Sequence, residues 1–164
     1  MMDFNREMAL RTMASAVPER MIYVGVDLGK LESHSAIVVL ERLEEVSTDL
    51  ADVLRAVGPR VRFVVRYGER LALDTDYTVV VKRVKQVVGQ LMSRGSVVLV
   101  VDETGVGVPV VEDMRRAAMG CPLYAVKISA GQQATAKSVP REELLTKMRM
   151  MGERGELEDR KSVV

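Results

Sequence analysis

The chain has 164 residues, of which 48% are hydrophobic and only 4% aromatic, with no tryptophan. This length suits one domain, whose core must consist of aliphatic side chains and Met, as in buried strands covered by helices. Lys and Arg (24) almost balance Asp and Glu (23), so net charge neither indicates nor excludes a nucleic acid partner.

Two further features limit the class of protein. The single cysteine, Cys121, excludes an internal disulfide and is interpreted as a small buried apolar group. Charged residues interrupt every apolar run, so no segment is long enough to cross a bilayer. We therefore expect a soluble protein of the cytoplasm with no membrane partner.

The first half of the chain predicts an N-terminal extension with helical character over residues 1–20, before one domain over 21–164. Strands are predicted where apolar runs end at acids, glycines or turns. One short helix is predicted between the second and third strands. The predicted strands cover 21–27, 35–42 and 61–67, and the helix covers 47–57. In the third strand, alternation assigns Phe63, Val65 and Tyr67 to one face and Arg62 and Arg66 to the other.

The second half alternates between strands and helices. The clearest helix has apolar residues at intervals of three and four, and the others begin near prolines. We predict helices over 75–92, from Pro109 to Gly120 and from Pro140, strands over 96–102 and 122–128, and a short strand after Gly155. The order β-β-β-α-β-α-β-α predicts an α/β fold with a mixed central sheet and helices on its faces.

Two predicted strands end in an aspartate before a glycine-bearing turn, in V-G-V-Asp27-L-Gly29 and V-V-Asp102-E-T-Gly105-V-Gly107. If these strands are neighbours, both carboxylates emerge at one edge of the sheet, where their repulsion favours a shared cation. Mg²⁺ or Mn²⁺ prefers such oxygen ligands, and two ions would activate water against a phosphodiester. Asp27 and Asp102 are therefore our candidate catalytic residues and metal ligands, with turn formation as the alternative for each alone.

Other chemistry-bearing residues carry weaker signals. The one histidine, His34, is interpreted as a solvated loop residue, and Ser33 and Ser35 lack an identifiable base. The C-terminal methionines (Met148, Met150, Met151) are interpreted as core residues. No G-x-x-x-x-G-K-S/T motif occurs, so any ATPase motor would have to lie elsewhere.

The quoted motifs resemble the nuclease domain of phage terminase large subunits, a ribonuclease H-like family that cuts DNA during genome packaging. The resemblance is carried by Y-V-G-V-D-L-G ending at Gly29, by the D-E-T-G-V-G-V-P-V-V block from Asp102, and by V-P-R-E-E-L-L from Val139. It implies a ribonuclease H-like fold, with Asp27 and Asp102 as ligands of Mg²⁺ or Mn²⁺. It also implies double-stranded DNA as substrate and a packaging ATPase or portal protein as partner.

The family's third metal-binding acid comes from a helix beyond the last strand. This sequence ends at Val164 before such a helix, and Asp159 comes too early to take the role. Three functions therefore stay open. The first is a metal-dependent endonuclease acting on double-stranded DNA, with Arg62, Arg66, Lys127 and Lys137 as candidate phosphate contacts. The second is a non-catalytic binding or assembly module, and the third a nuclease like the Holliday-junction resolvases, which G-V-D-L-G-K also resembles.

Overall fold

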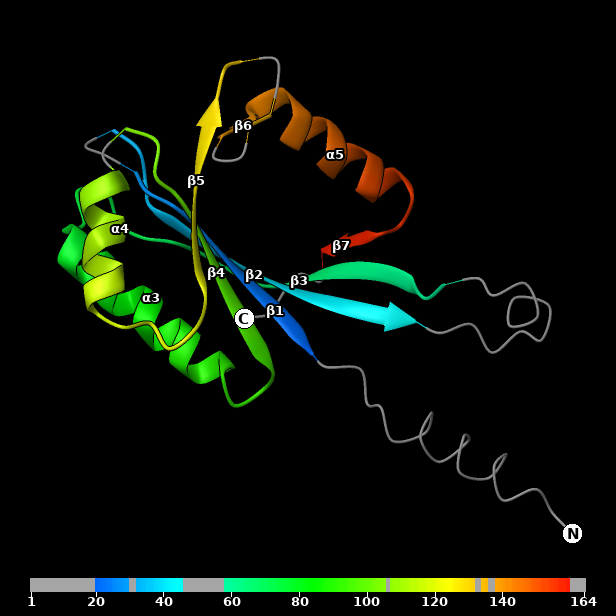
Figure 1. Ribbon diagram of the computed structural model, residues 1–164, viewed down its shortest axis with the longest axis horizontal. Helices are drawn as coiled ribbons and strands as arrows, with labels where there is room; N and C mark the ends of the chain where they lie inside the picture. The colour runs from blue at the N-terminus through cyan, green and yellow to red at the C-terminus, as the bar shows by residue number, and fades with distance from the viewer. Residues whose placement is uncertain are drawn as a thin grey trace, which may run out of the picture.

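The structure is a computed structural model that describes residues 20–29, 32–45, 58–105, 107–131, 134–135 and 138–159. These residues form one sheet with helices beside it (Figure 1). The elements are β1 Met21–Asp27, β2 Ala36–Glu45, β3 Arg60–Arg70, α3 Tyr77–Leu91, β4 Ser96–Asp102, α4 Gly107–Arg116, β5 Leu123–Ser129, β6 Ser138–Pro140, α5 Arg141–Glu153 and β7 Leu157–Asp159.

The sheet is mixed, as the sequence predicted. Its strand order is β6-β5-β4-β1-β2-β3-β7. The first three strands pair antiparallel, whereas β1, β4, β5 and β6 pair parallel and β7 joins β3 in parallel. The two strands that end in the candidate aspartates, β1 and β4, are therefore direct neighbours that run in the same direction.

One face of the sheet forms the hydrophobic core. Alternate residues of β1 and β4 are buried there, against the inner faces of α3 and α4. Burying one such aliphatic side chain stabilises the fold by about 1.5–3 kcal/mol. The most deeply buried members of this core are Ile37, Leu99, Met114, Val24, Val39, Val80, Val84, Val88, Val101 and Val111.

The helix α3 shows why packing, rather than helix propensity, holds this layer together. Its sequence is rich in valine, whose branched side chain disfavours a helix. Asp76, the N-cap residue, makes no side-chain capping hydrogen bond. The predicted apolar stripe is confirmed, because the valines of that stripe are buried against the sheet: Val80, Val81, Val84, Val87 and Val88.

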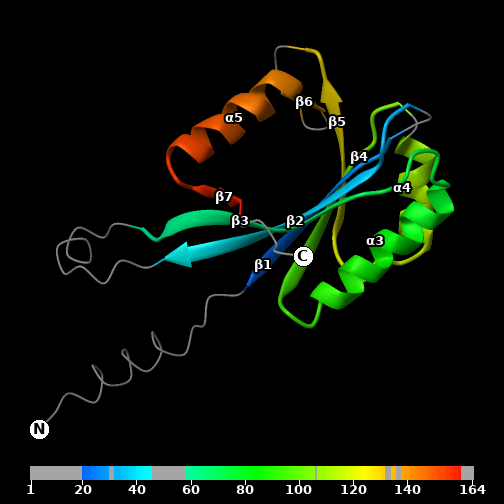
Figure 2. The ribbon, with the colours of Figure 1, turned by 180° about the vertical axis from the view of Figure 1, so that it is seen from behind.

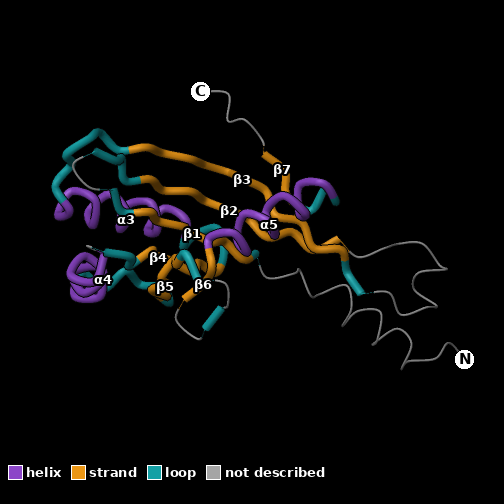
Figure 3. The backbone as a smooth tube through the Cα atoms, turned by 90° about the horizontal axis from the view of Figure 1, so that it is seen from above, coloured by secondary structure: helices purple, strands orange, loops and turns teal. Residues whose placement is uncertain are grey.

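The helix α5 is different, because none of its residues is buried. It lies apart from the α3–α4 pair, between β6 and β7, in the views from front, back and above (Figures 1, 2 and 3). Met148 and Met150 are exposed and Met151 is half-buried. The prediction that these methionines belong to the core was therefore wrong.

A β-bulge changes the faces of β3. Pairing with β2 shifts between Val39 and Leu40, so that Tyr67 lies opposite Val39 and Val65 lies opposite Leu40. One extra residue in β3 reverses the alternation at that point. Tyr67 consequently packs against the core, whereas Phe63 lies near the ring of Tyr23, 6.1 Å between centroids. The prediction of one shared face was wrong because no local pattern of residues signals the bulge.

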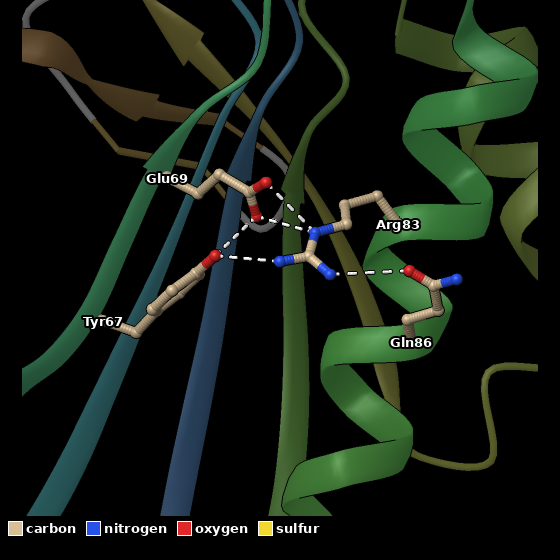
Figure 4. A network of polar contacts seen from close by, with 4 residues as sticks. All are labelled: Tyr67, Glu69, Arg83 and Gln86. Atoms are coloured by element: carbon tan, nitrogen blue, oxygen red, sulfur yellow. Dashed lines mark hydrogen bonds and ion pairs between the residues drawn. The ribbon is translucent and has the colours of Figure 1, made fainter. Parts of the chain in front are cut away.

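A polar network connects β3 to α3 (Figure 4). Arg83 Nε donates to both carboxylate oxygens of Glu69, at 3.1 and 2.9 Å, and a second guanidinium nitrogen donates to the Tyr67 hydroxyl at 3.0 Å. The Tyr67 hydroxyl donates to Glu69 at 2.8 Å. The hydrogen bond to Glu69 is the main cause that raises the pKa of Arg83. This network connects α3 to the end of β3 that precedes it.

The remaining predictions have mixed outcomes. The last short strand is confirmed as β7, whereas β6 was not predicted, and α4 ends at Arg116 rather than Gly120. Apart from Arg20, the predicted N-terminal extension and the predicted helix over 47–57 lie outside the described residues. Among the described residues, no helix is long and apolar enough to cross a membrane.

Candidate active site

Asp27 and Asp102 end two adjacent parallel strands in matching positions. The register pairs Val26 with Val101, the residues immediately before the two aspartates. Neighbouring strands lie about 5 Å apart, so the backbones of the two aspartates are separated by a distance on that order. The structure therefore brings both predicted residues to one edge of the sheet.

The two carboxylates also share a face. Val26 and Val101 are buried in the core, and successive side chains of a strand point to opposite faces. Asp27, which is exposed, and Asp102, which is half-buried, therefore lie on the face away from α3 and α4.

A single groove of about 530 Å³ contains both aspartates. Its lining residues come from the ends of β1 and β4, from the end of β5 and the residues next to it, from the turn after β4, and from α5. The lining residues beside the two aspartates are Thr104, Ile128, Ser129, Ala130, Arg141, Leu144, Leu145 and Met148. The groove thus contains two carboxylates, several apolar side chains and one guanidinium, that of Arg141 on α5.

Asp102 is held by the turn that follows it. Its Oδ1 accepts a hydrogen bond from the backbone N–H of Thr104 at 2.8 Å and another from the Thr104 hydroxyl. Thr104 Oγ1 also accepts from the backbone N–H of Ile128 at 3.0 Å, which ties the turn to β5. Asp102 therefore forms a turn, as the alternative interpretation stated. Both hydrogen bonds from Thr104 end on Oδ1, so they leave Oδ2 for a ligand.

Glycines allow the backbone to turn sharply after each aspartate. A Cβ on Gly107, the first residue of α4, would lie 2.8 Å from the carbonyl oxygen of Asp102. A Cβ on Gly29 would lie 2.2 Å from the carbonyl oxygen of Ser33. Because real Cβ atoms do not approach a carbonyl oxygen so closely, any larger residue would displace these turns.

The donors in the groove fit a hard cation. Mg²⁺ keeps several water ligands and is commonly bound through one or two carboxylates. The described residues contain no group of three or more His, Cys, Asp or Glu that could hold a metal, so a zinc centre with protein ligands alone does not fit. Asp27 and Asp102 are the residues that would hold a Mg²⁺ or Mn²⁺ ion.

Two of the basic residues proposed as phosphate contacts are engaged elsewhere. Arg66 Nε donates to Glu41 at 2.6 Å, and Glu41, whose side chain is only 5% exposed, also pairs with Arg20. Arg62 pairs with Glu45 and with Glu158. Lys127 is exposed, and Lys137 lies outside the described residues. Arg62 and Arg66 therefore hold strands together, a role that alternation alone did not reveal.

The loop with the only histidine has a structural role. His34 is half-buried and its Nδ1 lies 2.7 Å from the carbonyl oxygen of Leu71, so its interpretation as a solvated residue was wrong. Ser35 is buried and its Oγ accepts from the backbone N–H of Gly29 at 3.1 Å. Ser33 and Ser35 line a separate pocket of about 300 Å³ with Tyr77, whose hydroxyl donates to the Gly29 carbonyl at 3.0 Å.

Cys121 is half-buried, and burial raises the pKa of its thiol. A thiol with a raised pKa is protonated at neutral pH and is a poor nucleophile. This agrees with its interpretation as a small apolar group.

Comparisons of sequence give no match: no family model matches the chain, and neither does any curated protein. Comparison with solved structures gives matches. The chain is similar to the large terminase nuclease from the thermophilic phage G20c, solved with bound zinc, with a TM-score of 0.54 and 18% identity. The match covers 89% of this chain and 67% of that chain.

The fold is ribonuclease H-like. The predicted fold class is thus confirmed, and at 18% identity the likeness to the terminase nuclease concerns the fold alone. A second similar structure is RuvC of Thermus thermophilus, with a TM-score of 0.39, 20% identity, and coverage of 64% of this chain and 60% of that chain.

Two functional candidates in the groove were missed from the sequence. Thr104 was seen only as part of a turn, although an Asp-x-Thr sequence after a strand is a signal for a side chain that fixes the aspartate. Arg141 was missed because nothing in the local pattern brings the start of α5 to the edge of β1 and β4. In the chain, α5 lies between the short strands β6 and β7, which pair with β5 and β3.

Proposed function

We propose that this domain is a metal-dependent endonuclease that cleaves double-stranded DNA at the groove between β1, β4 and α5, as part of phage genome packaging. Asp27 and Asp102 hold Mg²⁺ or Mn²⁺. The ribonuclease H-like fold and the likeness to a terminase nuclease support the proposal. A packaging ATPase or portal protein is the expected partner.

One observation carries the proposal. Two carboxylates lie at matching ends of adjacent parallel strands, on one face and in one open groove. The hydrophobic core on the opposite face does not include either aspartate. A divalent cation bound by both carboxylates would offset their negative charges.

The chemistry follows from what each residue can do. A bound divalent cation would activate water and stabilise the leaving oxygen of a phosphodiester. Asp102 is fixed by Thr104 through its Oδ1, which leaves its Oδ2 for the cation, while Asp27 supplies the second carboxylate. The groove opens to solvent, so an extended phosphate backbone can reach the two acids.

The test is cleavage of linear duplex DNA with Mg²⁺ or Mn²⁺ by the whole chain and by Asp27→Asn and Asp102→Asn. Each substitution removes one charge, and the amide oxygen introduced by Asp102→Asn can still accept the hydrogen bonds from Thr104. We expect the cleavage rate to fall by at least about 10²-fold in each variant, because a metal ligand is lost, with little change in stability. EDTA should abolish cleavage.

Asp76→Asn is the matched control. Asp76 is exposed, also lies beyond a strand, and lines the separate pocket near Tyr77, and Asn is equally good at a helix N-cap. This variant should cleave like the unchanged chain. Cleavage that survives both groove substitutions would show that these aspartates are not the catalytic ligands. A preference for four-way junctions over linear duplex would favour the resolvase-like alternative.

A specific observation favours a second candidate, a non-catalytic binding or assembly module. The described residues supply two carboxylates to the groove and no third His, Cys, Asp or Glu completes a metal-binding group. This candidate is distinguished by calorimetry. If the domain is a non-catalytic module, neither Mg²⁺ nor Mn²⁺ should bind. If it is a nuclease, one of them should bind, and the binding should be lost in Asp102→Asn.

A further inference from the structure

Arg141 is the cationic residue among those that line the acidic groove. It is the first residue of α5, it is exposed, and it shares the groove with Asp27 and Asp102. The other cation with a known contact on α5, Lys147, donates to Glu143 at 2.6 Å. No ion pair of the described residues includes Arg141. Among the described residues, no carboxylate therefore competes with an external anion for its guanidinium.

Helix stability does not account for an arginine at this position. The N-terminus of a helix carries partial positive charge, so a cation in the first turn is unfavourable and a carboxylate is favourable. Glu142 and Glu143 follow that preference, whereas Arg141 opposes it. An arginine that weakens its own helix yet lies in the groove with two acids is consistent with a role in binding.

We propose that Arg141 binds the two non-bridging oxygens of a DNA phosphodiester that occupies the groove with Asp27 and Asp102. The inference rests on the proposed nuclease function and names the residue that positions the substrate. A guanidinium presents two parallel N–H donors, which match two oxygens of a phosphate. Arg141 therefore acts as a substrate-positioning residue in the same groove as the two aspartates.

The charges of the groove agree with this role. Two carboxylates carry two negative charges and Arg141 carries one positive charge, so the side chains alone make the groove acidic and repel DNA. A divalent cation on the aspartates makes the groove positive by one charge, which one phosphodiester neutralises. The phosphate would then be bound by the guanidinium of Arg141, while Asp27 and Asp102 would hold the cation.

Binding of a short DNA duplex, followed by fluorescence anisotropy, tests this assignment. Titrations with Ca²⁺, at several salt concentrations, compare the unchanged chain with Arg141→Gln, Arg141→Lys and Arg149→Gln. Arg149 is the matched control because it is an exposed arginine of α5 that does not line the groove. Thermal unfolding confirms that each variant is folded.

We expect Arg141→Gln to weaken duplex binding about tenfold and to lower the slope of log affinity against log salt by about one. Arg141→Lys keeps the charge and should keep the slope while losing part of the affinity. Arg149→Gln should bind within about twofold of the unchanged chain. Equal affinities and slopes for Arg141→Gln and Arg149→Gln would overturn the assignment.

A different result would assign the guanidinium to the aspartates instead. Arg141→Gln could bind Mn²⁺ several times more tightly while its duplex binding is unchanged. Arg141 would then be the counterion of Asp27 and Asp102, and its assignment to the phosphate would be wrong. The two proposals can also fail separately. Duplex binding that depends on Arg141 without any cleavage would contradict only the nuclease, whereas metal-dependent cleavage with an unchanged KM in Arg141→Gln would contradict only the role of Arg141.

Discussion

The two faces of the sheet have opposite characters although they are made by the same strands. On one face, alternate residues of β1 and β4 pack against α3 and α4, and Leu99 and Val101 are fully buried. On the other face, β1 and β4 end in aspartates, and α5 crosses the edge without burying a single residue. Leu145 and Met148 of that helix remain 57% and 55% exposed.

This contrast separates stability from function within one layer of structure. The α3–α4 face holds the strands in register and so sets the positions of Asp27 and Asp102. The α5 face contributes charge, a groove and an exposed apolar wall. Substitutions on the first face should therefore change folding, and substitutions on the second should change binding.

Leu99→Ala should have the largest effect on stability. Leu99 is fully buried in β4, in the core on the face opposite Asp102. Removing its side chain leaves a cavity that costs about 2–5 kcal/mol. Urea unfolding, monitored by circular dichroism, measures this loss. A loss below about 1 kcal/mol would mean that the α3–α4 face is not the principal source of stability.

Arg83→Met should have an intermediate effect. The variant keeps the length of the side chain but removes the hydrogen bonds to Glu69 and Tyr67, and the partly buried Glu69 loses its cation. We expect a loss of about 1–1.5 kcal/mol in urea unfolding. Arg115→Met is the control, because its exposed i,i+3 pair with Glu112 should contribute about 0.5 kcal/mol or less. Equal losses in the two variants would show that the network adds nothing to stability.

Leu145→Ala should have the smallest effect on stability. The side chain is exposed on α5, and alanine is a good helix former, so the change should stay within about 0.5 kcal/mol. Thermal and urea unfolding check this expectation against Leu99→Ala. A loss comparable to that of Leu99→Ala would mean that α5 packs on the fold more tightly than its exposure indicates, and the contrast between the faces would disappear.

The regular elements could be predicted from the sequence because their patterns are local. The valine stripe of α3 and the apolar runs of β1 and β4 are determined by burial, and the structure confirms them. The bulge in β3 and the three-residue strand β6 could not be predicted, since neither changes the local pattern of apolar residues. The exposure of the methionines on α5 depends on where the helix crosses the sheet, which is a property of the whole fold.

The two aspartates of the candidate site could also be predicted from the sequence, because their signal is local. An acid at the end of an apolar strand is a local signal, and the parallel pairing of β1 with β4 brings Asp27 and Asp102 together as expected. The assignment of Arg62 and Arg66 to phosphate failed because their carboxylate partners come from β2 and β7. Arg141 reaches the groove through a contact between elements that are distant in sequence, which no local pattern encodes.

Diffraction from crystals soaked in Mn²⁺, with anomalous scattering used to locate the ion, tests most directly whether Asp27 and Asp102 bind a common cation. We expect an anomalous peak about 2.0–2.2 Å from a carboxylate oxygen of each aspartate, with water at the remaining positions. The peak should vanish in Asp102→Asn. Carboxylates that stay without an ion at saturating Mn²⁺, or an ion bound by only one of them, would contradict the shared site.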